Sequence, residues 1–418
     1  MNSDLIIVGG GIAGLYAAYQ HIKQNPRLKI TILERNRQLG GRIDTFHGKH
    51  YTVEAGAGRF HNNQVLVMKL IHELGLDDKL VPISGFDHYM TNGKLYSTKP
   101  MQKIIKRIIQ ASKREPDADV VLKNTVFLDY AKTIITKDEA ALLYDSFGYS
   151  SELTDMNAFD AIVLMEEHFN PKNQYYVLAG GLYQIVEKIV DKLKAANGGV
   201  KMLTRHRVND IQYVEGQGHG GMEHEFKLTC DNIKRPYYAS KCICAVPKET
   251  LLKLHIFSPI YPMLNLIKTL PLCRIYGQFP VHGGPWFKDL PKITTNNHLR
   301  IVIPMDESTG TMMISYTDNK FARYWKNIMD VGGVDGVARL HHKLLEKTTH
   351  MQIIPVPEHI EMFYWEHGVA YFAPGFDSSV MPYQIMKPYI GVPLYVCGEN
   401  YSAKNNQWIE GALEGNYL

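Results

Sequence analysis

Long hydrophobic runs are missing from this sequence. No apolar stretch in its 418 residues reaches the length of about 18 that a transmembrane helix requires. The apolar segment near the start, residues 5–19, follows no basic residue and is broken by four glycines, unlike a signal peptide. We therefore expect neither a membrane span nor a signal peptide, and a cytoplasmic location.

A strong excess of one charge is also missing. Lys and Arg number 46, Asp and Glu number 42, and the net charge is only +4. No overall field therefore favours nucleic acid or a membrane surface as a partner. The apolar fraction of 45% is typical of soluble globular proteins. Because single cores stop growing near about 250 to 300 residues, the length predicts at least two domains.

Cysteine is scarce, with five residues, Cys230, Cys242, Cys244, Cys273 and Cys397. They fall mostly in apolar, strand-like runs, which favours buried free thiols and a reducing compartment. A metal or redox pair is the alternative for Cys242 and Cys244, but two residues separated by one lie on the same face of a strand.

Histidine is plentiful, at 18 residues, but without the fixed spacing of a metal site. We predict no metal. His61, His168 and His367 fall in segments near the predicted site, and we expect them to be surface or hydrogen-bonded histidines.

The first 35 residues have the pattern of a βαβ unit. Residues 5–8 are a continuous apolar strand, residues 9–14 a glycine turn, residues 15–22 have helical spacing, and a second strand ends at Glu34. This unit predicts an α/β fold that begins with a parallel sheet. The later strand-like segments are spaced too widely for one continuous βαβ series.

The glycine turn matches a dinucleotide-binding motif. Gly9 permits the tight turn, Gly11 lets the backbone approach a pyrophosphate, and Gly14 allows close packing of helix on strand. Ile12 and Ala13 open the helix, whose free N–H groups favour phosphate. Glu34, 20 residues after Gly14, is predicted to accept hydrogen bonds from a ribose and argues against NADP.

Two other segments have clear local patterns. Residues 99–179 look mostly helical, with Ile104, Ile105, Ile108 and Ile109 on one face of a basic helix. We interpret it as a surface helix of a helical subdomain; a membrane-surface helix is the alternative. Residues 216–222 predict a hairpin loop between two antiparallel strands.

The segment that follows Glu34, ERNRQLGGRIDTF, resembles the flavin amine oxidase family. In that family a Gly-Gly-Arg turn lies along the pyrophosphate and ribityl chain of FAD. The resemblance implies that FAD is the cofactor and that Arg35, Gly41 and Arg42 belong to its site.

Four further segments extend this resemblance over residues 5–416. Gly180 and Gly181 match a helix start, Val208 the adenine contact, and Pro247 a strand that returns toward the flavin. The closing segment YVCGENYSAKNNQWIEGALEGN implies that Glu399 lies near the ribityl chain and that Ile409 offers its backbone to the flavin.

The resemblance also assigns a substrate side. Trp408 is expected as an aromatic wall, and Arg59 stands where the L-amino-acid oxidase branch carries the clamp for the substrate carboxylate. The planar fork of Arg suits a carboxylate; an ion pair with Glu54 or a helix end is the structural alternative. Val369 replaces the tyrosine or flavin-linking cysteine of monoamine oxidases, which implies non-covalent FAD.

Two positions depart from the family pattern. Arg274 occupies the usual place of a lysine near flavin N5, and an arginine cannot give up its proton at working pH; Lys268 is a weaker candidate for that role. A tyrosine that helps to hold the carboxylate is replaced by Ile303. We expect Arg59, Arg274 and Trp408 to serve catalysis, and Arg59, Ile303, Val369 and Trp408 to line the substrate site.

The sequence thus predicts an FAD-binding Rossmann-like domain, an interleaved α+β substrate domain and a helical subdomain. We assign residues 1–48, 180–262 and 391–418 to the first, 49–98 and 263–390 to the second, and 99–179 to the third. The final helix is short or is completed by another subunit, so a homodimer is considered.

The expected activity is oxidation of a C–N bond, in an L-amino acid rather than a simple amine. It involves hydride transfer to flavin N5, hydrolysis of the imine and release of H2O2 after reaction with O2. The alternatives are an amine or polyamine oxidase or related desaturase, with Glu166 and Glu167 attracting a cationic substrate, and an FAD-binding structural protein that has lost catalysis.

Overall fold

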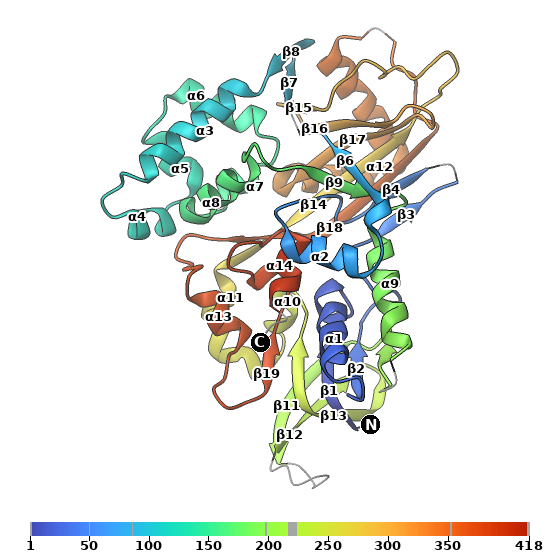
Figure 1. Ribbon diagram of the computed structural model, residues 1–418. Coiled ribbons are helices and arrows are strands. Elements are labelled where there is room, and N and C mark those ends of the chain that lie inside the picture. Colours follow the sequence, from blue (N-terminus) through green and yellow to red (C-terminus); the bar gives the residue numbers. More distant parts are fainter. Residues whose placement is uncertain are drawn as a thin grey trace.

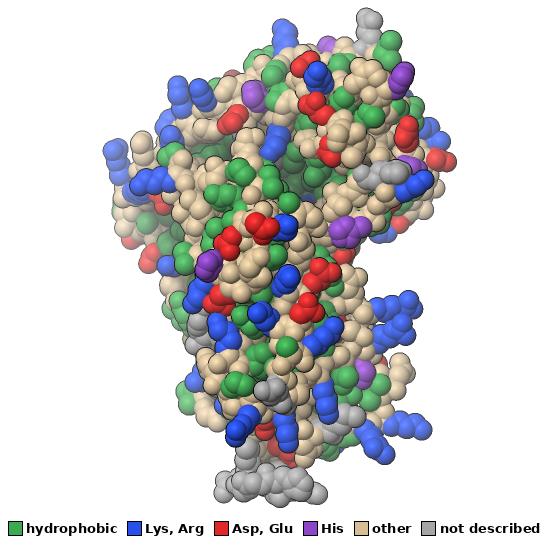
Figure 2. All heavy atoms as spheres, turned by 45° about the vertical axis from the view of Figure 1, so that its right-hand side comes forward, with side chains coloured by type: hydrophobic (Ala, Val, Ile, Leu, Met, Phe, Trp, Pro, Cys, Tyr) green, Lys and Arg blue, Asp and Glu red, His purple; other side chains and the backbone are tan. Residues whose placement is uncertain are grey.

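The computed structural model describes residues 2–49, 51–85, 87–196, 199–215, 224–351 and 353–415. Figure 1 shows a lower sheet with α1 and α9 beside it, an upper sheet with α12, and a group of helices at the upper left. In Figure 2, Lys and Arg side chains are spread over the lower half and the upper left of the face, and acidic side chains lie in its middle and upper right.

The lower sheet has the strand order β10-β2-β1-β13-β12-β11, and β19 also pairs with β13. Its strands are β1 (Asn2–Val8), β2 (Ile30–Leu33), β10 (Lys201–Leu203), β11 (Val208–Glu215), β12 (His224–Cys230), β13 (Ile233–Cys244) and β19 (Leu394–Val396). β1 pairs in parallel with β2 and β13, while β11, β12 and β13 form an antiparallel meander. The predicted parallel start and hairpin are confirmed; the loop at 216–222 lies outside the described residues.

Both faces of the lower sheet are covered, which explains the continuous apolar run of β1. Leu5 and Ile7 belong to a cluster with α1 (Ile12–Gln24) and α9 (Tyr183–Lys194), and Ile6 and Val8 belong to a cluster on the other face. That second cluster includes buried residues of α10 (Lys248–Leu251), η2 (His255–Ile260), α11 (Tyr261–Asn265) and α13 (Met381–Met386). A strand enclosed on both sides needs apolar residues at every position.

The prediction that the cysteines are buried free thiols is confirmed. Cys242 and Cys244 lie in the second cluster, and all five cysteines are buried and free. Burial alone raises the pKa of Cys397 to about 12, so its thiol stays protonated.

The upper sheet has the order β18-β14-β17-β16-β15-β7-β8. Its strands are β7 (His88–Thr91), β8 (Lys94–Ser97), β14 (Ile267–Gln278), β15 (Ile293–Thr295), β16 (Ile301–Asp306), β17 (Thr311–Asp318) and β18 (His359–Phe372). The helix α12 (Asn319–Thr349) packs on it through Trp325, Val337 and Leu345 and is interrupted at Gly333. β14 and β18 pair antiparallel along nearly their whole length, from Ile267 opposite Phe372 to Gln278 opposite His359.

His341 lies on the buried face of α12. Its side chain is 0% exposed, and neither ring nitrogen has a hydrogen-bond partner among the described residues. Burial, and then the neighbouring His342, lowers the pKa of His341 to about 3. The imidazole is therefore neutral in the folded protein, and protonation favours the unfolded chain.

This burial predicts an acid-sensitive part of the stability. Below the unfolded pKa of about 6.5 the unfolded chain binds a proton that the folded chain does not, so the free energy of unfolding falls as the pH drops. In the wild type, we expect His341 to lower the free energy of unfolding by about 1.5 kcal/mol between pH 6.5 and pH 5. In His341→Met this contribution should be absent. Urea unfolding of both proteins at several pH values measures it; identical pH slopes would contradict the assignment.

The helical group at the upper left of Figure 1 consists of α3 (Lys99–Ser112), α4 (Ala118–Asn124), α5 (Phe127–Lys132), α6 (Lys137–Ser146), α7 (Ser151–Thr154) and α8 (Ala158–His168). Ile104, Ile105 and Ile108 of α3 are buried in its core and Ile109 packs against it, as expected of a surface helix. Among the described residues no helix is long and apolar enough to cross a membrane.

The predicted helical segment ends differently from our expectation. Residues 175–178 form β9 (Tyr175–Leu178), which pairs with β5 (Phe60–His61) and β6 (Leu80–Ile83). The consecutive Tyr175, Tyr176 and Val177 favour a strand by their bulk and branching. The remaining elements are β3 (Thr45–His47), β4 (Thr52–Glu54), α2 (Val65–Glu73), η1 (Asp77–Lys79), η3 (Glu399–Tyr401) and α14 (Ile409–Glu414). The domain boundaries assigned above remain a prediction.

Candidate active site

The glycine turn between β1 and α1 has the geometry that its sequence predicts. A Cβ added at Gly9, whose φ is +104°, would lie 2.3 Å from the Ala245 carbonyl oxygen, and one at Gly14 would lie 2.0 Å from the Gly9 carbonyl oxygen. A Cβ at Gly11 would meet nothing closer than Gly41 Cα at 3.7 Å. The fold therefore requires Gly9 and Gly14, whereas the bare backbone at Gly11 is left for another group.

Glu34 lies buried at the end of β2 and holds this turn. Its Oε2 accepts the Gly10 N–H at 2.7 Å and its Oε1 accepts the Asn36 N–H at 2.8 Å. The His206 N–H donates to the Glu34 carbonyl oxygen at 2.7 Å, which brings the segment before Val208 alongside. Val208 itself is buried in the sheet core, and Arg35 is exposed. The carboxylate thus joins the turn to the predicted adenine side.

The Gly-Gly-Arg segment lies directly against the glycine turn. The Gly40 N–H donates to the Gly10 carbonyl oxygen at 2.8 Å, and a Cβ on Gly41 would lie 3.1 Å from Gly11 Cα. Gly40 and Gly41 have φ values of +108° and +62°, which favour glycine. Two backbone segments without side chains therefore meet here. Such a surface fits a diphosphate, which needs N–H donors and close approach.

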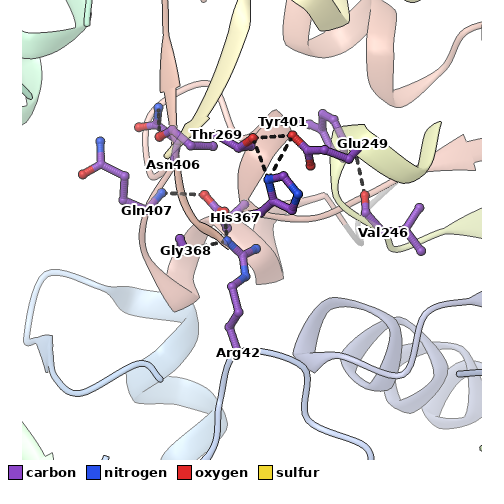
Figure 3. A network of polar contacts seen from close by, with 11 residues as sticks. Arg42, Val246, Glu249, Thr269, His367, Gly368, Tyr401, Asn406 and Gln407 are labelled. Atoms are coloured by element: carbon purple, nitrogen blue, oxygen red, sulfur yellow. Dashed lines mark hydrogen bonds and ion pairs between the residues drawn. The ribbon is translucent and has the colours of Figure 1, made fainter. Parts of the chain in front are cut away.

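Arg42 reaches up from the lower part of Figure 3 into a network of polar contacts. Its Nη1 donates to Glu399 Oε1 at 2.5 Å and to the Gly368 carbonyl oxygen at 3.1 Å. The other oxygen of Glu399 accepts the Gln407 N–H at 2.7 Å, and Gln407 has a left-handed φ of +75°. The network therefore ties the Gly-Gly-Arg segment to β18 and to the loop that ends at Trp408.

A second group of side chains lies in the same view. Thr269 bonds to Glu249, and His367 Nδ1 lies 3.3 Å from the Thr269 hydroxyl oxygen. Tyr401 donates to the Val246 carbonyl oxygen at 2.8 Å. That bond fixes the segment before Pro247, which caps α10.

Trp408 is the hub of an aromatic cluster. Its ring meets those of His61 and His168 edge to face, with centroids 5.4 Å and 5.5 Å away, and the Tyr175 ring at 6.4 Å. These residues come from β5, α8, β9 and the loop before α14. The predicted aromatic wall is therefore accompanied by three rings that we did not assign to it from the sequence.

Our expectation that His61 and His168 are surface or satisfied histidines is wrong. His61 is buried, and neither His61 Nδ1 nor His168 Nε2 has a hydrogen-bond partner within the described part of the chain. Burial, and then Arg59, lowers the pKa of His61 to about 4 and that of His168 to about 3. Both rings are neutral near pH 7. They were missed because single histidines in a sequence carry no sign of their burial.

Arg59 adjoins this cluster. Its guanidinium carbon lies 5.1 Å from the centroid of the Tyr175 ring, and the residue is half-buried. The charge of Arg59 also acts on Tyr149 and Glu152. The predicted clamp and the predicted wall are thus brought to one place. The Glu54 carboxylate accepts the Leu182 N–H at 2.7 Å and the Thr45 hydroxyl at 2.9 Å, so it anchors the start of α9.

Arg274 is buried beneath the segment that carries Arg59. Its Nη1 donates to the Glu54 carbonyl oxygen at 3.0 Å, and its guanidinium carbon lies 4.6 Å from the Tyr316 ring centroid. A Cβ on Gly58 would lie 2.7 Å from that Nη1. Burial opposes its charge, but Tyr316 and Tyr276 raise the pKa of Arg274. The group is a fixed cation and has no proton to exchange.

The other predicted substrate residues lie at different places. Val369 packs toward the helical group on the same face of β18 as Tyr371. Ile303 packs near Tyr276 and Met313. Lys268 is half-exposed and lies 3.7 Å from Asp155.

The acidic residues of the rival interpretation lie near the surface. Glu166 pairs with Lys113 at 2.7 Å, and Glu167 lies 3.7 Å from His61. Of the two, only Glu167 reaches the aromatic cluster.

The last helix packs close to the glycine turn. Ile409, Ala412 and Leu413 of α14 share a core cluster with Ile12 and Ala13 of α1. Glu410, which we did not predict, accepts the N–H groups of Leu66 and Val67 at 2.9 Å and so caps α2. The sequence did contain a signal for this role: Glu410 lies in the apolar closing segment, and an acid buried there needs a hydrogen-bond partner.

Comparisons with known proteins identify the family of the chain. A family model described as flavin containing amine oxidoreductase matches residues 12–415. An L-amino-acid oxidase from Siganus canaliculatus is 28% identical over 364 residues, 76% of this chain and 66% of that protein. Polyamine oxidase 5 from Oryza sativa subsp. japonica is 31% identical over 377 residues, 83% of this chain and 73% of that protein.

A shorter match, 29% identical over 97 residues, is to a coproporphyrinogen III oxidase from Staphylococcus aureus, and it covers 23% of this chain and 21% of that protein. The chain thus spans about a fifth of that relative. The family model, in contrast, runs from the start of α1 to the residue after α14. The chain therefore belongs to the family of flavin-containing amine oxidoreductases.

Proposed function

We propose that this protein is an FAD-dependent oxidase of L-amino acids. The observation that supports it most is the position of Arg59, over Tyr175 and in the same cluster as Trp408. A guanidinium beside aromatic walls can hold a substrate carboxylate by two parallel hydrogen bonds while excluding water. The L-amino-acid oxidase among the relatives is consistent with this substrate class.

FAD fits the residues that are present. The backbones of Gly11 and Gly41 meet without side chains, so a pyrophosphate could approach them closely, and the start of α1 offers N–H groups to it. In this proposal Glu34 also accepts a hydrogen bond from a ribose hydroxyl, and the Arg42–Glu399 bridge lies along the ribityl chain. When bound, FAD would accept the hydride from the carbon that carries the amine.

The residues of this chain position the substrate and control its proton. Arg59 fixes the carboxylate, and Trp408 limits the orientation of the side chain. The neutral His61 and His168 rings add no positive charge to the cluster, and their desolvated surroundings favour the neutral amine that must react. Arg274 contributes a fixed positive charge below the Arg59 segment, which stabilises an anion and cannot act as a base.

The overall reaction consumes an amino acid, water and O2 and yields a 2-oxo acid, ammonia and H2O2. Incubating the purified protein with FAD and L- or D-amino acids, and measuring these three products, tests it. Equal amounts of 2-oxo acid and peroxide from L-amino acids support the proposal. Turnover of amines or polyamines alone would instead support the alternative represented by the polyamine oxidase relative, and no turnover with bound FAD the structural alternative.

Non-covalent binding of the flavin is a further prediction. By the sequence resemblance, Val369 stands where monoamine oxidases carry a flavin-linking cysteine. Valine offers no nucleophile, so in this proposal the cofactor is held by contacts that denaturation breaks. We expect acid precipitation to leave FAD in the supernatant and a colourless pellet. Absorbance of both fractions is the measurement, and a yellow pellet after washing would show a covalent link.

A further inference from the structure

Glu152 is a buried acid that the proposed function does not use. It belongs to α7, is 3% exposed, and its Oε2 has no hydrogen-bond partner among the described residues. A buried carboxyl group without a partner loses much of the free energy of its hydration. Such a group therefore either binds a ligand or lowers the stability of the folded protein.

Holding α7 in place does not explain Glu152, because another acid has that role. Asp318 accepts the Ser150 N–H at 2.9 Å, the Ser150 hydroxyl at 3.0 Å and the Ser151 N–H at 2.7 Å. Asp318 is itself fully buried. Two acids thus lie close together, and one of them is satisfied by the backbone while Glu152 is not.

The surroundings of Glu152 connect it to the candidate substrate site. The charged and titratable groups that act with it are Asp318 at the end of β17, Arg59, Tyr149 before α7, Tyr175 of β9 and Tyr371 of β18. Arg59 and Tyr175 adjoin Trp408. Contacts agree with this: the ring of Tyr149, three residues before Glu152, meets the Tyr316 ring with centroids 5.4 Å apart, and the Arg274 guanidinium carbon lies 4.6 Å from that same ring. Arg274 in turn lies against Gly58, next to Arg59. Glu152 therefore comes from the helical group, on a separate part of the chain, into the neighbourhood of Arg59.

We propose that Glu152 binds a second, cationic group of the substrate, so that the preferred substrates are basic α-amino acids with an ω-amino or guanidino group. This inference rests on the proposed function, in which Arg59 holds the carboxylate. The opposite charges of Arg59 and Glu152 then match the two charged ends of such a molecule.

A cationic ligand group accounts for the unpaired carboxyl group of Glu152 better than a neutral polar group does. Burial, and then the charge of Asp318, raises the pKa of Glu152 to about 8, although Arg59 lowers it. The carboxyl group is therefore largely protonated near pH 7 in the absence of a partner. An ammonium group beside two acids would restore its ionisation, and the resulting pair is strong because it is shielded from water.

The test compares substrates that differ only in the distal charge. Lysine and norleucine have side chains of the same carbon length, as have ornithine and norvaline. With the FAD-loaded enzyme under anaerobic conditions, we expect the second-order rate constant of flavin reduction to favour lysine over norleucine. In Glu152→Gln, which keeps the shape of the side chain, this ratio should fall roughly 30-fold or more.

Asp129→Asn is the matched control. Asp129 is an exposed acid of α5 in the same helical group, paired with Lys132 at 2.9 Å. Its substitution should leave the lysine-to-norleucine ratio as in the wild type. The flavin content and melting temperature of each variant show that the fold is retained. The proposal would be overturned if lysine and norleucine reduced the wild-type flavin equally fast. It would also be overturned if the lysine-to-norleucine ratio were unchanged in Glu152→Gln.

The design separates this inference from the proposed function. If amino acids fail to reduce the flavin but amines succeed, the proposed function is wrong, and cadaverine compared with pentylamine then tests Glu152 in the same way. If norleucine and lysine both reduce it without preference, the proposed function stands and only the role of Glu152 fails.

Discussion

Gly11→Ala is expected to give a folded protein that no longer binds FAD. The added methyl group meets nothing in the protein closer than 3.7 Å, and the φ of Gly11 is −72°, which alanine adopts readily. The same methyl group would occupy the space in which a pyrophosphate approaches the backbone. We expect an affinity for FAD at least roughly 100-fold lower. Flavin content after dialysis against FAD measures the loss.

Two other glycines separate cofactor loss from misfolding. Gly336→Ala in α12, whose added Cβ would contact the Ile328 carbonyl oxygen at 3.5 Å, should stay yellow and stable. Gly14→Ala forces a methyl group to within 2.0 Å of the Gly9 carbonyl oxygen and should lower stability by about 1–3 kcal/mol or more. The stability of Gly11→Ala must be compared with flavin-free wild type, because FAD itself stabilises the folded state. A Gly11→Ala variant that keeps the full FAD content of the wild type would refute the site.

Arg59→Ala is expected to reduce the rate constant of flavin reduction by α-amino acids, at limiting substrate, by roughly 100- to 1000-fold. The substitution removes the fork that binds the carboxylate. It leaves the aromatic walls and the flavin contacts in place. The loss corresponds to about 3 to 4 kcal/mol of transition-state binding. Anaerobic stopped-flow reduction of the FAD-loaded variants is the measurement.

Arg59→Lys and a substrate without a carboxylate are the controls for this effect. Lysine keeps the charge but loses the planar fork, so an intermediate rate is expected. Amines that correspond to decarboxylated amino acids should react similarly with wild type and Arg59→Ala. If Arg59→Ala slows amines and amino acids equally, the arginine has a structural role, such as the ion pair that we considered as the alternative.

The lower half of the fold could be predicted closely from the sequence. The glycine spacing, the apolar run of β1 and the acid at the end of β2 are local signals, and each has one physical explanation. The Gly-Gly-Arg segment pairs with the glycine turn through the Gly40–Gly10 hydrogen bond, which joins residues 30 positions apart in the sequence. The resemblance to a family, and not periodicity, indicated that these segments meet.

The substrate side was predicted less completely. Glu152, His61 and His168 come from segments that are distant in the sequence, and nothing local shows that their polar atoms are buried. Tyr175 was assigned to a helical region because the surrounding residues have helical spacing, but β9 forms by pairing with β5 and β6. The environment of these residues depends on burial and strand pairing between distant segments. The local pattern of a single sequence does not show such contacts.

The most direct test of the account is anaerobic mixing of the purified yellow protein with L-amino acids, followed by admission of air. Loss of the flavin absorption reports transfer of a hydride without any assumption about the acceptor. We predict bleaching by L-amino acids, weak or no bleaching by simple amines, and recovery of the colour in air despite Arg274. A protein with bound FAD that amines bleach and L-amino acids do not would contradict the assignment of Arg59 and of the substrate class.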